Sequence, residues 1–211
     1  ASPAARGRIP DFVGSDRAAA HLTELPAWRR ARTVKINPDR AQQPARQLAL
    51  SRGKLLFMAV PKLALPEPFF RLDRAELNAP PEQLADRRYA AEVAPTASLD
   101  SLPPIDLIVC GSVAVNYAGV RVGKGAGYTD IEVALLVDAG LLTPDTVIVT
   151  TVHDLQVLDE DLPREPHDFT VDYILTPRRL IPCERGILPR GINWNVLDPE
   201  LRASIPVLQK S

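Results

Sequence analysis

The chain has 211 residues, with 25 basic and 26 acidic side chains and a formal charge of −1. This length is enough to bury one substantial core, which favours a single domain over residues 1–211. The near-neutral charge excludes a nucleic-acid surface that depends on bulk positive charge, although a local basic patch stays open. Hydrophobic residues make up 45% of the chain and charged residues 24%, which excludes a disordered protein.

No apolar run in the sequence approaches the roughly 20 residues that a membrane span requires, and residues 1–11 lack the apolar core of a signal peptide. The two cysteines, Cys110 and Cys183, form neither a disulfide framework nor a metal-ligand spacing. We therefore expect a cytoplasmic protein that does not bind membranes. Residues 1–14 are expected to be a flexible or truncated segment.

The first legible element is an alanine-rich helix over residues 15–25. Ser15 is its expected cap, and Pro26 is expected to stop it. Residues 32–36 alternate between apolar and polar side chains, which predicts a short strand that ends before Asn37-Pro38.

A second helix is expected over residues 44–51, because Pro44 suits the first helical position and glycine follows the segment. Residues 55–60 form a continuous apolar run, which is typical of a strand buried on both faces. Residues 63–102 are rich in Pro, Ala, Glu and Arg, and we expect irregular structure with one short helix there.

Order returns with two further buried strands, over residues 105–110 and 146–152, and a last strand over residues 171–175. A helix that begins near Tyr128 and extends to about residue 142 lies between the first two. Strands that alternate with helices over this length indicate an α/β domain with a mostly parallel sheet.

Three glycines alternate directly ahead of that helix, at Gly123, Gly125 and Gly127. Without a Cβ, their backbone N–H groups can converge on an anion. The start of the helix adds the positive end of its dipole. The spacing matches neither the Walker pattern nor the dinucleotide fingerprint, so glycine alone leaves a flexible surface turn as an open interpretation.

Charged side chains in the same segment favour phosphate binding over a simple turn. Arg121 stands at the entrance of the loop and Lys124 within it, so that two cations can meet phosphate oxygens. Asp130 at the helix start is placed to hold a divalent cation that bridges those oxygens. Asp130 as a helix cap and Lys124 as a solvated loop cation remain the alternatives.

A second acidic cluster precedes the last strand. Asp168 is the better candidate for a further metal ligand, whereas Asp172 is interpreted as a strand-start residue. His153-Asp154 follows a buried strand, where active-site residues of open α/β sheets collect, but a histidine that forms a turn is the favoured interpretation.

The segment Arg121-Val-Gly-Lys-Gly-Ala-Gly-Tyr-Thr-Asp130 resembles the Arg-x-Gly-x-Gly-x-Gly-Tyr-x-Asp signature of the 5-formyltetrahydrofolate cyclo-ligase family. Residues 106–115 look like the strand that leads into that loop, and residues 163–177 look like the closing segment of the family. Gly53-Lys54 with the following strand is similar to the Gly-Lys-strand-Pro-Arg stretch. The likeness covers most of residues 30–180 and is closest to the methenyltetrahydrofolate synthetase domain-containing branch.

The resemblance implies a three-layer α/β/α fold and the use of ATP and Mg²⁺ to phosphorylate the formyl oxygen of a folate, which then closes to 5,10-methenyltetrahydrofolate. It implies that Asp130 and Asp168 hold magnesium and that Arg121 and Lys124 serve catalysis by positioning and charge stabilisation. The implied ATP-binding residues are Arg121, Gly123, Lys124, Gly125, Ala126, Gly127 and Tyr128.

The chain departs from the family pattern in three places. Residues 1–14 contain Arg6 and Arg8 but no basic helix, residues 37–44 stand where the family has an acidic contact to folate, and Thr129 replaces a second tyrosine. Two functions follow as alternatives. One is a cyclo-ligase, or a relative that acts on another formyl or amide acceptor. The other is a non-catalytic nucleotide- or RNA-binding module on the same fold, with RNA disfavoured because no RNP-like aromatic motif is present.

Overall fold

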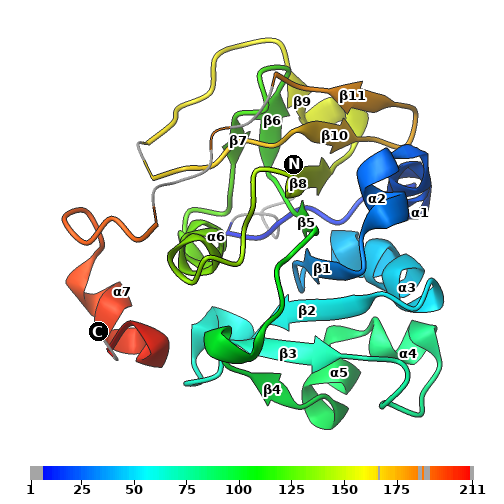
Figure 1. The fold of residues 1–211 in the computed structure, drawn as a ribbon. Coiled ribbons are helices and arrows are strands. Elements are labelled where there is room, and N and C mark those ends of the chain that lie inside the picture. The colour runs from blue at the N-terminus through cyan, green and yellow to red at the C-terminus, as the bar shows by residue number, and fades with distance from the viewer. Residues whose placement is uncertain (1–6, 166, 185–186, 188–190, 210–211) are drawn as a thin grey trace.

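The chain is built on a large, mostly parallel sheet that carries helices on both faces (Figure 1). The computed structural model describes residues 7–165, 167–184, 187 and 191–209. The eight strands of the sheet are β1 (Thr33–Ile36), β2 (Leu55–Ala59), β3 (Phe69–Leu72), β4 (Thr96–Ala97), β5 (Leu107–Cys110), β8 (Val147–Thr151), β10 (Tyr173–Leu175) and β11 (Leu180–Pro182). Their order is β11-β10-β8-β5-β1-β2-β3-β4.

The centre of this sheet is parallel and its edges are antiparallel. Strands β10, β8, β5, β1 and β2 pair in parallel, whereas β3, β4 and β11 pair antiparallel with their neighbours. The expected mostly parallel sheet is therefore confirmed, and the predicted strands over residues 32–36, 55–60, 105–110, 146–152 and 171–175 all belong to it.

Helices pack on both sides of the sheet, because the central strands are apolar on both faces. The helices are α1 (Ser15–Ala20), α2 (Pro26–Arg30), α3 (Gln43–Ser51), α4 (Pro81–Leu84), α5 (Arg87–Val93), α6 (Tyr128–Asp138) and α7 (Pro199–Ser204). Strand β5 shows the division: Ile108 and Cys110 pack in the core with α6 and α7, whereas Leu107 and Val109 pack with α1 to α5. The two cores make the sheet the middle of three layers.

The prediction for residues 63–102 was wrong in its detail. This stretch contains two strands, β3 and β4, and two short helices, α4 and α5. Strand β4 has only two residues and α4 only four, so neither is long enough to give a periodic pattern. Proline also opens α4 rather than interrupting structure there.

The expected cap of the first helix was also wrong. Gly14, in a left-handed conformation with φ 88°, holds the N-cap position of α1, and no side chain caps the helix. A 3₁₀ turn over His21–Glu24 continues α1, and Pro26 both ends that segment and opens α2. Residues 1–6 lie outside the described residues, whereas Gly7–Gly14 are described and lead into α1.

A second, three-stranded sheet leads into the glycine-rich segment. It pairs β6 (Ala114–Asn116) with β7 (Arg121–Val122) and with β9 (Val157–Leu158), in the order β7-β6-β9. The hairpin between β6 and β7 turns at Gly119, which has φ 80° and lies against the backbone of Val171. The hairpin ends at Arg121 and Val122 of β7, and the loop ahead of α6 follows directly.

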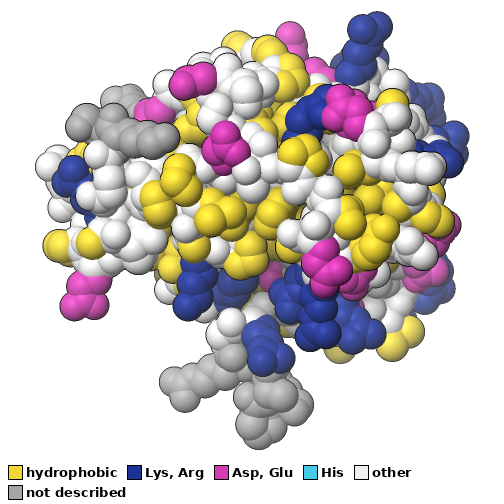
Figure 2. All heavy atoms as spheres, turned by 90° about the horizontal axis from the view of Figure 1, so that it is seen from below, with side chains coloured by type: hydrophobic (Ala, Val, Ile, Leu, Met, Phe, Trp, Pro, Cys, Tyr) yellow, Lys and Arg dark blue, Asp and Glu magenta, His cyan; other side chains and the backbone are white. Residues whose placement is uncertain are grey.

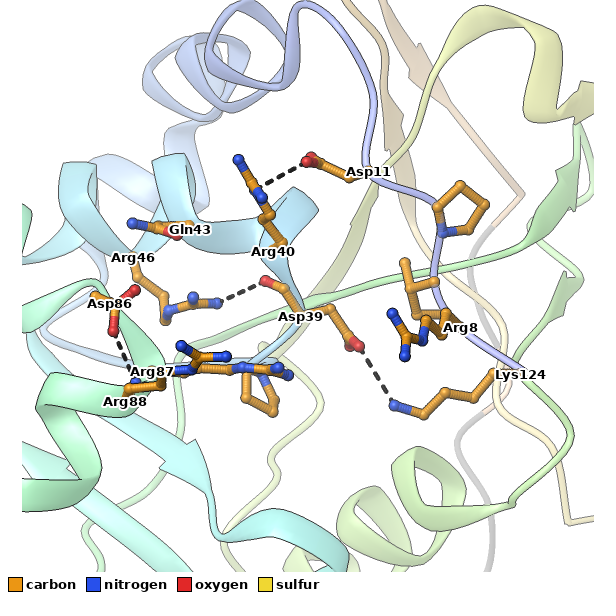
Figure 3. A pocket seen from close by; sticks show the side chains of 13 residues that line it. Arg8, Asp11, Asp39, Arg40, Gln43, Arg46, Asp86, Arg87, Arg88 and Lys124 are labelled. Carbon is orange, nitrogen blue, oxygen red and sulfur yellow. Dashed lines mark hydrogen bonds and ion pairs between the residues drawn. The ribbon is translucent and has the colours of Figure 1, made fainter. Parts of the chain in front are cut away.

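Among the described residues, no helix is both long enough and apolar enough to cross a membrane. Figure 2, which shows the molecule from below relative to Figure 1, has Lys and Arg side chains in several groups, including one along the lower edge of this face. Local basic regions therefore coexist with a net charge of −1.

Candidate functional site

The glycine-rich loop lies between β7 and α6 with its residues 124–127 exposed. Gly125 and Gly127 have φ 86° and 68°, the left-handed region that glycine adopts without strain. Nothing lies within 4 Å of where a Cβ would stand on either glycine. The loop thus needs glycine for its backbone path rather than for lack of room, and its outer face is open to a ligand.

This loop separates two cavities. The larger has a volume of about 1060 Å³ and includes Lys124 in its wall, and the smaller, of about 200 Å³, is lined by Gly125, Gly127 and Asp130. His167, from the segment before β10, completes the polar side of the smaller cavity, whose remaining wall is mostly apolar. A ligand bound to the loop can therefore be approached from two sides.

Arg121 is directed inward from the loop entrance. Its side chain is 2% exposed, pairs with the carboxylate of Asp130 and stacks with its guanidinium carbon 4.0 Å from the ring centre of Phe169. Its Nε has no hydrogen-bond partner among the described atoms. In this conformation Arg121 orients Asp130, a pairing that could not be predicted from the residue pattern.

Asp130 and Asp168 lie close enough to influence each other. Burial raises the pKa of the Asp130 carboxyl above its usual range, Arg121 opposes this, and the charge of Asp168 raises the pKa further. Asp168 accepts a hydrogen bond from the backbone N–H of Glu165 at 2.8 Å. The structure thus brings together the two carboxylates that the sequence analysis paired.

Magnesium is commonly held by one or two protein carboxylates, with water and phosphate oxygens completing its shell. The described residues contain no cluster of three or more potential metal ligands. The pair of Asp130 and Asp168 fits a metal that phosphate helps to hold, and it does not fit an all-protein metal cage.

Lys124 is held across the larger cavity by a residue that the sequence analysis did not select. Its Nζ lies 3.3 Å from Oδ1 of Asp39, on the segment that follows β1. Asp39 itself is fixed through its backbone, because the buried Arg46 donates to the carbonyl oxygens of Asn37 and Asp39. The position of Asp39, just beyond the end of a buried parallel strand, was the available signal.

A second link joins the same segment to the start of α6. The amide nitrogen of Asn37 donates to Oγ1 of Thr129 at 3.1 Å. Lys35 donates to Oδ1 of Asn37 and forms a buried ion pair with Glu132 of α6. The threonine that departs from the family pattern is therefore part of a buried polar network beneath the loop.

One buried side-chain acceptor, Oε1 of Gln42, is unsatisfied among the described residues. Gln42 donates from Nε2 to the backbone oxygen and hydroxyl of Thr151, but its Oε1 has no partner among the described atoms. A Cβ added to Gly111 would come within 2.7 Å of this oxygen and 2.8 Å of Ile9. Residues of the N-terminal segment thus pack over Gln42.

The other candidate residues have structural roles. His153 caps the turn Asp154–Gln156, with its ring accepting from the backbone N–H of Leu155, as the favoured interpretation expected. Asp172 accepts from the N–H of Ile148 at 2.8 Å and so ties β10 to β8.

The chain belongs to the 5-formyltetrahydrofolate cyclo-ligase family, whose model matches residues 3–177. The matched range includes the glycine loop and α6. The NMR structure of 5,10-methenyltetrahydrofolate synthetase from Aquifex aeolicus has the same fold, with a TM-score of 0.55 and 22% identity over 82% of this chain and 83% of that one.

Relatives with higher identity are named methenyltetrahydrofolate synthase domain-containing protein. The Bos taurus protein is 42% identical and the Homo sapiens protein 39% identical, each over 96% of this chain and 54% of the relative. The chain thus spans about half the length of these relatives. A 5-formyltetrahydrofolate cyclo-ligase from Mycolicibacterium smegmatis is 33% identical over 40% of each chain.

Proposed function

We propose that the chain is an ATP- and Mg²⁺-dependent cyclo-ligase that converts 5-formyltetrahydrofolate to 5,10-methenyltetrahydrofolate. The γ-phosphoryl group of ATP is transferred to the formyl oxygen and ADP leaves. N10 of the folate then attacks the activated carbon and loses its proton, and phosphate leaves as the ring closes. The observation that carries this proposal is the glycine loop between two cavities, with Lys124 on one side and Asp130 on the other. Family membership supports the same class of reaction.

Positioning and charge stabilisation are the main tasks of the protein in such a transfer. The backbone N–H groups of residues 123–128 bind phosphate oxygens, and Lys124 offsets the charge that develops on the transferred group. To do so Lys124 turns from Asp39, 3.3 Å away, toward the ligand. Arg121 acts from behind by holding Asp130 in one orientation.

Asp130 and Asp168 are the residues that would hold magnesium. A bound Mg²⁺ would neutralise phosphate charge and orient the phosphate oxygens. Burial raises the pKa of the Asp130 carboxyl, and the positive charge of Arg121 offsets part of that rise. Arg121 therefore favours the ionised form that a metal requires.

The acceptor is assigned to the larger cavity. Its volume of about 1060 Å³ is sufficient for a folate. A relative that acts on another formyl or amide acceptor would use the same loop and carboxylates.

The test is the appearance of methenyltetrahydrofolate absorbance from 5-formyltetrahydrofolate with Mg-ATP, beside a thermal shift with Mg-ATP alone. We expect product that requires ATP and that falls at least 100-fold in Asp130→Asn, because loss of a preorganised charge in such sites has effects of about that size. The control is Asp145→Asn, an exposed residue outside both cavities.

A thermal shift without product would overturn the folate reaction and direct the search to another acceptor. The absence of both a thermal shift and product would overturn the phosphate assignment as well. That outcome would leave a binding module as the function of this fold.

A further inference from the structure

The C-terminal segment, residues 191–209, forms one wall of the smaller cavity. This segment lies beyond the range that the family model matches, which ends at residue 177. Its residues 191–193, 196–198 and 201 line the cavity together with the glycine loop and α6. In Figure 1 the segment is coloured orange to red and leads past α6 into α7. The smaller cavity therefore joins the glycine loop to a part of the chain that the family match does not include.

The described part of this segment is tied to the rest of the protein near both of its ends. The backbone N–H of Ile192 donates to Oδ2 of Asp138, the last residue of α6, at 3.0 Å. Gly191 lies so close to the same carboxylate that an added Cβ would come within 1.7 Å of Oδ1. Further along, Ile205 and Leu208 are buried in the core that contains α6. A wall held in this way is preorganised for a ligand.

The lining of the smaller cavity is mostly apolar. Ile131 and Ala134 of α6 contribute to it, as do Ile192, Leu197 and Leu201 of the C-terminal segment. Among the described residues that line this cavity, none is a lysine or an arginine. Phosphate oxygens are therefore poorly served inside it, whereas the uncharged part of a ligand whose phosphates bind the loop is well served.

One polar group at the edge of the cavity has no partner within the protein. The Nδ1 atom of His167 is buried and makes no hydrogen bond to any described atom, while Nε2 of the same ring lies 3.8 Å from Oδ1 of Asp168. A buried nitrogen without a partner is costly, so a ligand that offers it a hydrogen bond gains affinity. Apolar surface with a hydrogen-bonding group at its edge is the combination that a heterocycle requires.

The size of the cavity limits what it can hold. Its volume of about 200 Å³ is below the roughly 300–1,000 Å³ of pockets for drug-sized molecules, which leaves room for a single ring system. Because the glycine loop borders the cavity, a ring system there can belong to the same ligand as phosphates on the loop. A nucleobase meets these conditions of size, polarity and position.

We propose that the smaller cavity binds the base of the nucleotide, and that the C-terminal segment is thus part of the nucleotide site. This proposal rests on the proposed function, because the phosphates are placed at the glycine loop. The nucleotide crosses the loop, with its base between α6 and residues 191–201 and its γ-phosphate near Lys124 at the larger cavity.

The experiment compares Mg-ATP with Mg-tripolyphosphate by titration calorimetry, because tripolyphosphate carries the phosphates without the nucleoside. In the wild type we expect Mg-ATP to bind about tenfold more tightly, the gain when roughly 60 Å² of apolar surface leaves water. Ala134→Leu places a larger side chain in the cavity, and it is expected to lose this difference and keep its affinity for tripolyphosphate. The matched control Ala139→Leu makes the same change at the exposed end of α6, outside both cavities, and keeps the difference.

A second variant is needed because Ala134 is only 5% exposed, so that Ala134→Leu can fail to fold. Val196 lines the cavity but is 57% exposed, and Val196→Ser therefore removes apolar wall with little effect on stability. It is expected to lower the preference for Mg-ATP about threefold. Val93→Ser, at an exposed valine of α5 outside both cavities, is its control and keeps the full preference.

Two results would overturn the proposal while leaving the phosphate loop and the folate reaction intact. One is equal affinity of the wild type for Mg-ATP and Mg-tripolyphosphate. The other is an unchanged preference for Mg-ATP in the folded cavity variants. Binding of neither probe to the wild type would overturn the phosphate assignment itself, and this proposal with it.

Discussion

At the scale of single residues, Lys35 and Glu132 connect the central sheet to the start of α6. Both are buried and paired, and Lys35 also donates to Asn37. Glu132→Ala leaves the Lys35 ammonium buried without its counter-charge, and we predict a loss of about 3 kcal/mol in the free energy of unfolding. Urea denaturation measures it.

The double variant Lys35→Met/Glu132→Leu removes both charges and replaces them with apolar groups. It is predicted to recover most of the loss, because a buried ion pair is often replaceable by apolar packing. If the double variant is as unstable as Glu132→Ala, then lost packing and not the unpaired charge causes the loss in the free energy of unfolding.

Asp86 is predicted to stabilise α5 as its N-cap. Asp86→Ala removes the acceptor for the N–H groups of Arg88 and Tyr89 and should lower the free energy of unfolding by about 1 kcal/mol at pH 7. Asp86→Asn retains a capping oxygen and is the matched control, with a loss of only a few tenths of that value expected.

The effect of Asp86→Ala is also predicted to depend on pH. The pKa of Asp86 is lowered in the folded protein. Its carboxylate therefore contributes fully to the free energy of unfolding above its unfolded pKa of about 4. That contribution is lost as the pH falls through the lower, folded pKa. The wild type and Asp86→Ala should therefore converge in stability below about pH 4. A difference that stays constant as the pH falls well below that value would contradict the role of the charge.

At the scale of elements, the hairpin of β6 and β7 aims the glycine loop, and it depends on Gly119. A Cβ at this position would lie 2.3 Å from the carbonyl oxygen of Val171. Gly119→Ala is predicted to lower the free energy of unfolding by about 2 kcal/mol or more, through strain at positive φ and the collision.

Gly53→Ala is the matched control, because Gly53 also has positive φ, 68°, but nothing within 4 Å of the added Cβ. It should cost only about 1 kcal/mol for the strain. Equal losses in chemical denaturation of the two variants would contradict the close approach of β6–β7 to Val171.

The elements that the sequence predicted are those with long apolar runs. Strands β2 and β5 are buried almost throughout. A strand of that kind can be predicted from its own apolar run, without knowledge of its neighbours. By contrast β4, β7 and β9 have two residues each, and they exist because a partner strand supplies their hydrogen bonds. Pattern alone does not detect such elements.

The candidate site likewise has a part that could be predicted from the sequence and a part that could not. The glycine loop and Asp130 are contiguous in sequence, so their proximity was predictable. Asp39 reaches Lys124 of the loop, with Arg46 holding the backbone of Asp39, only because the fold brings the segment after β1 next to the loop ahead of α6. Arg121 was expected to face phosphate. It is directed inward instead, because its guanidinium group pairs with Asp130 and stacks on Phe169.

At the scale of the whole molecule, the loop and its two cavities lie where β1, the β6–β7 hairpin and α6 meet. Asn37 and Asp39 hold opposite ends of the loop region, through Thr129 and Lys124. The sheet therefore fixes the loop at both ends while the glycines between stay exposed. Such a loop is preorganised for a ligand that binds through backbone N–H groups.

The central claim is that this loop binds the phosphates of ATP through Lys124, and calorimetric titration with Mg-ATP tests it most directly. We predict that Lys124→Ala binds Mg-ATP about tenfold more weakly than the wild type, the effect of one charge-assisted contact. It should unfold at an unchanged temperature, and the exposed control Arg52→Ala should bind like the wild type. Equal affinity of wild type and a folded Lys124→Ala would contradict the claim.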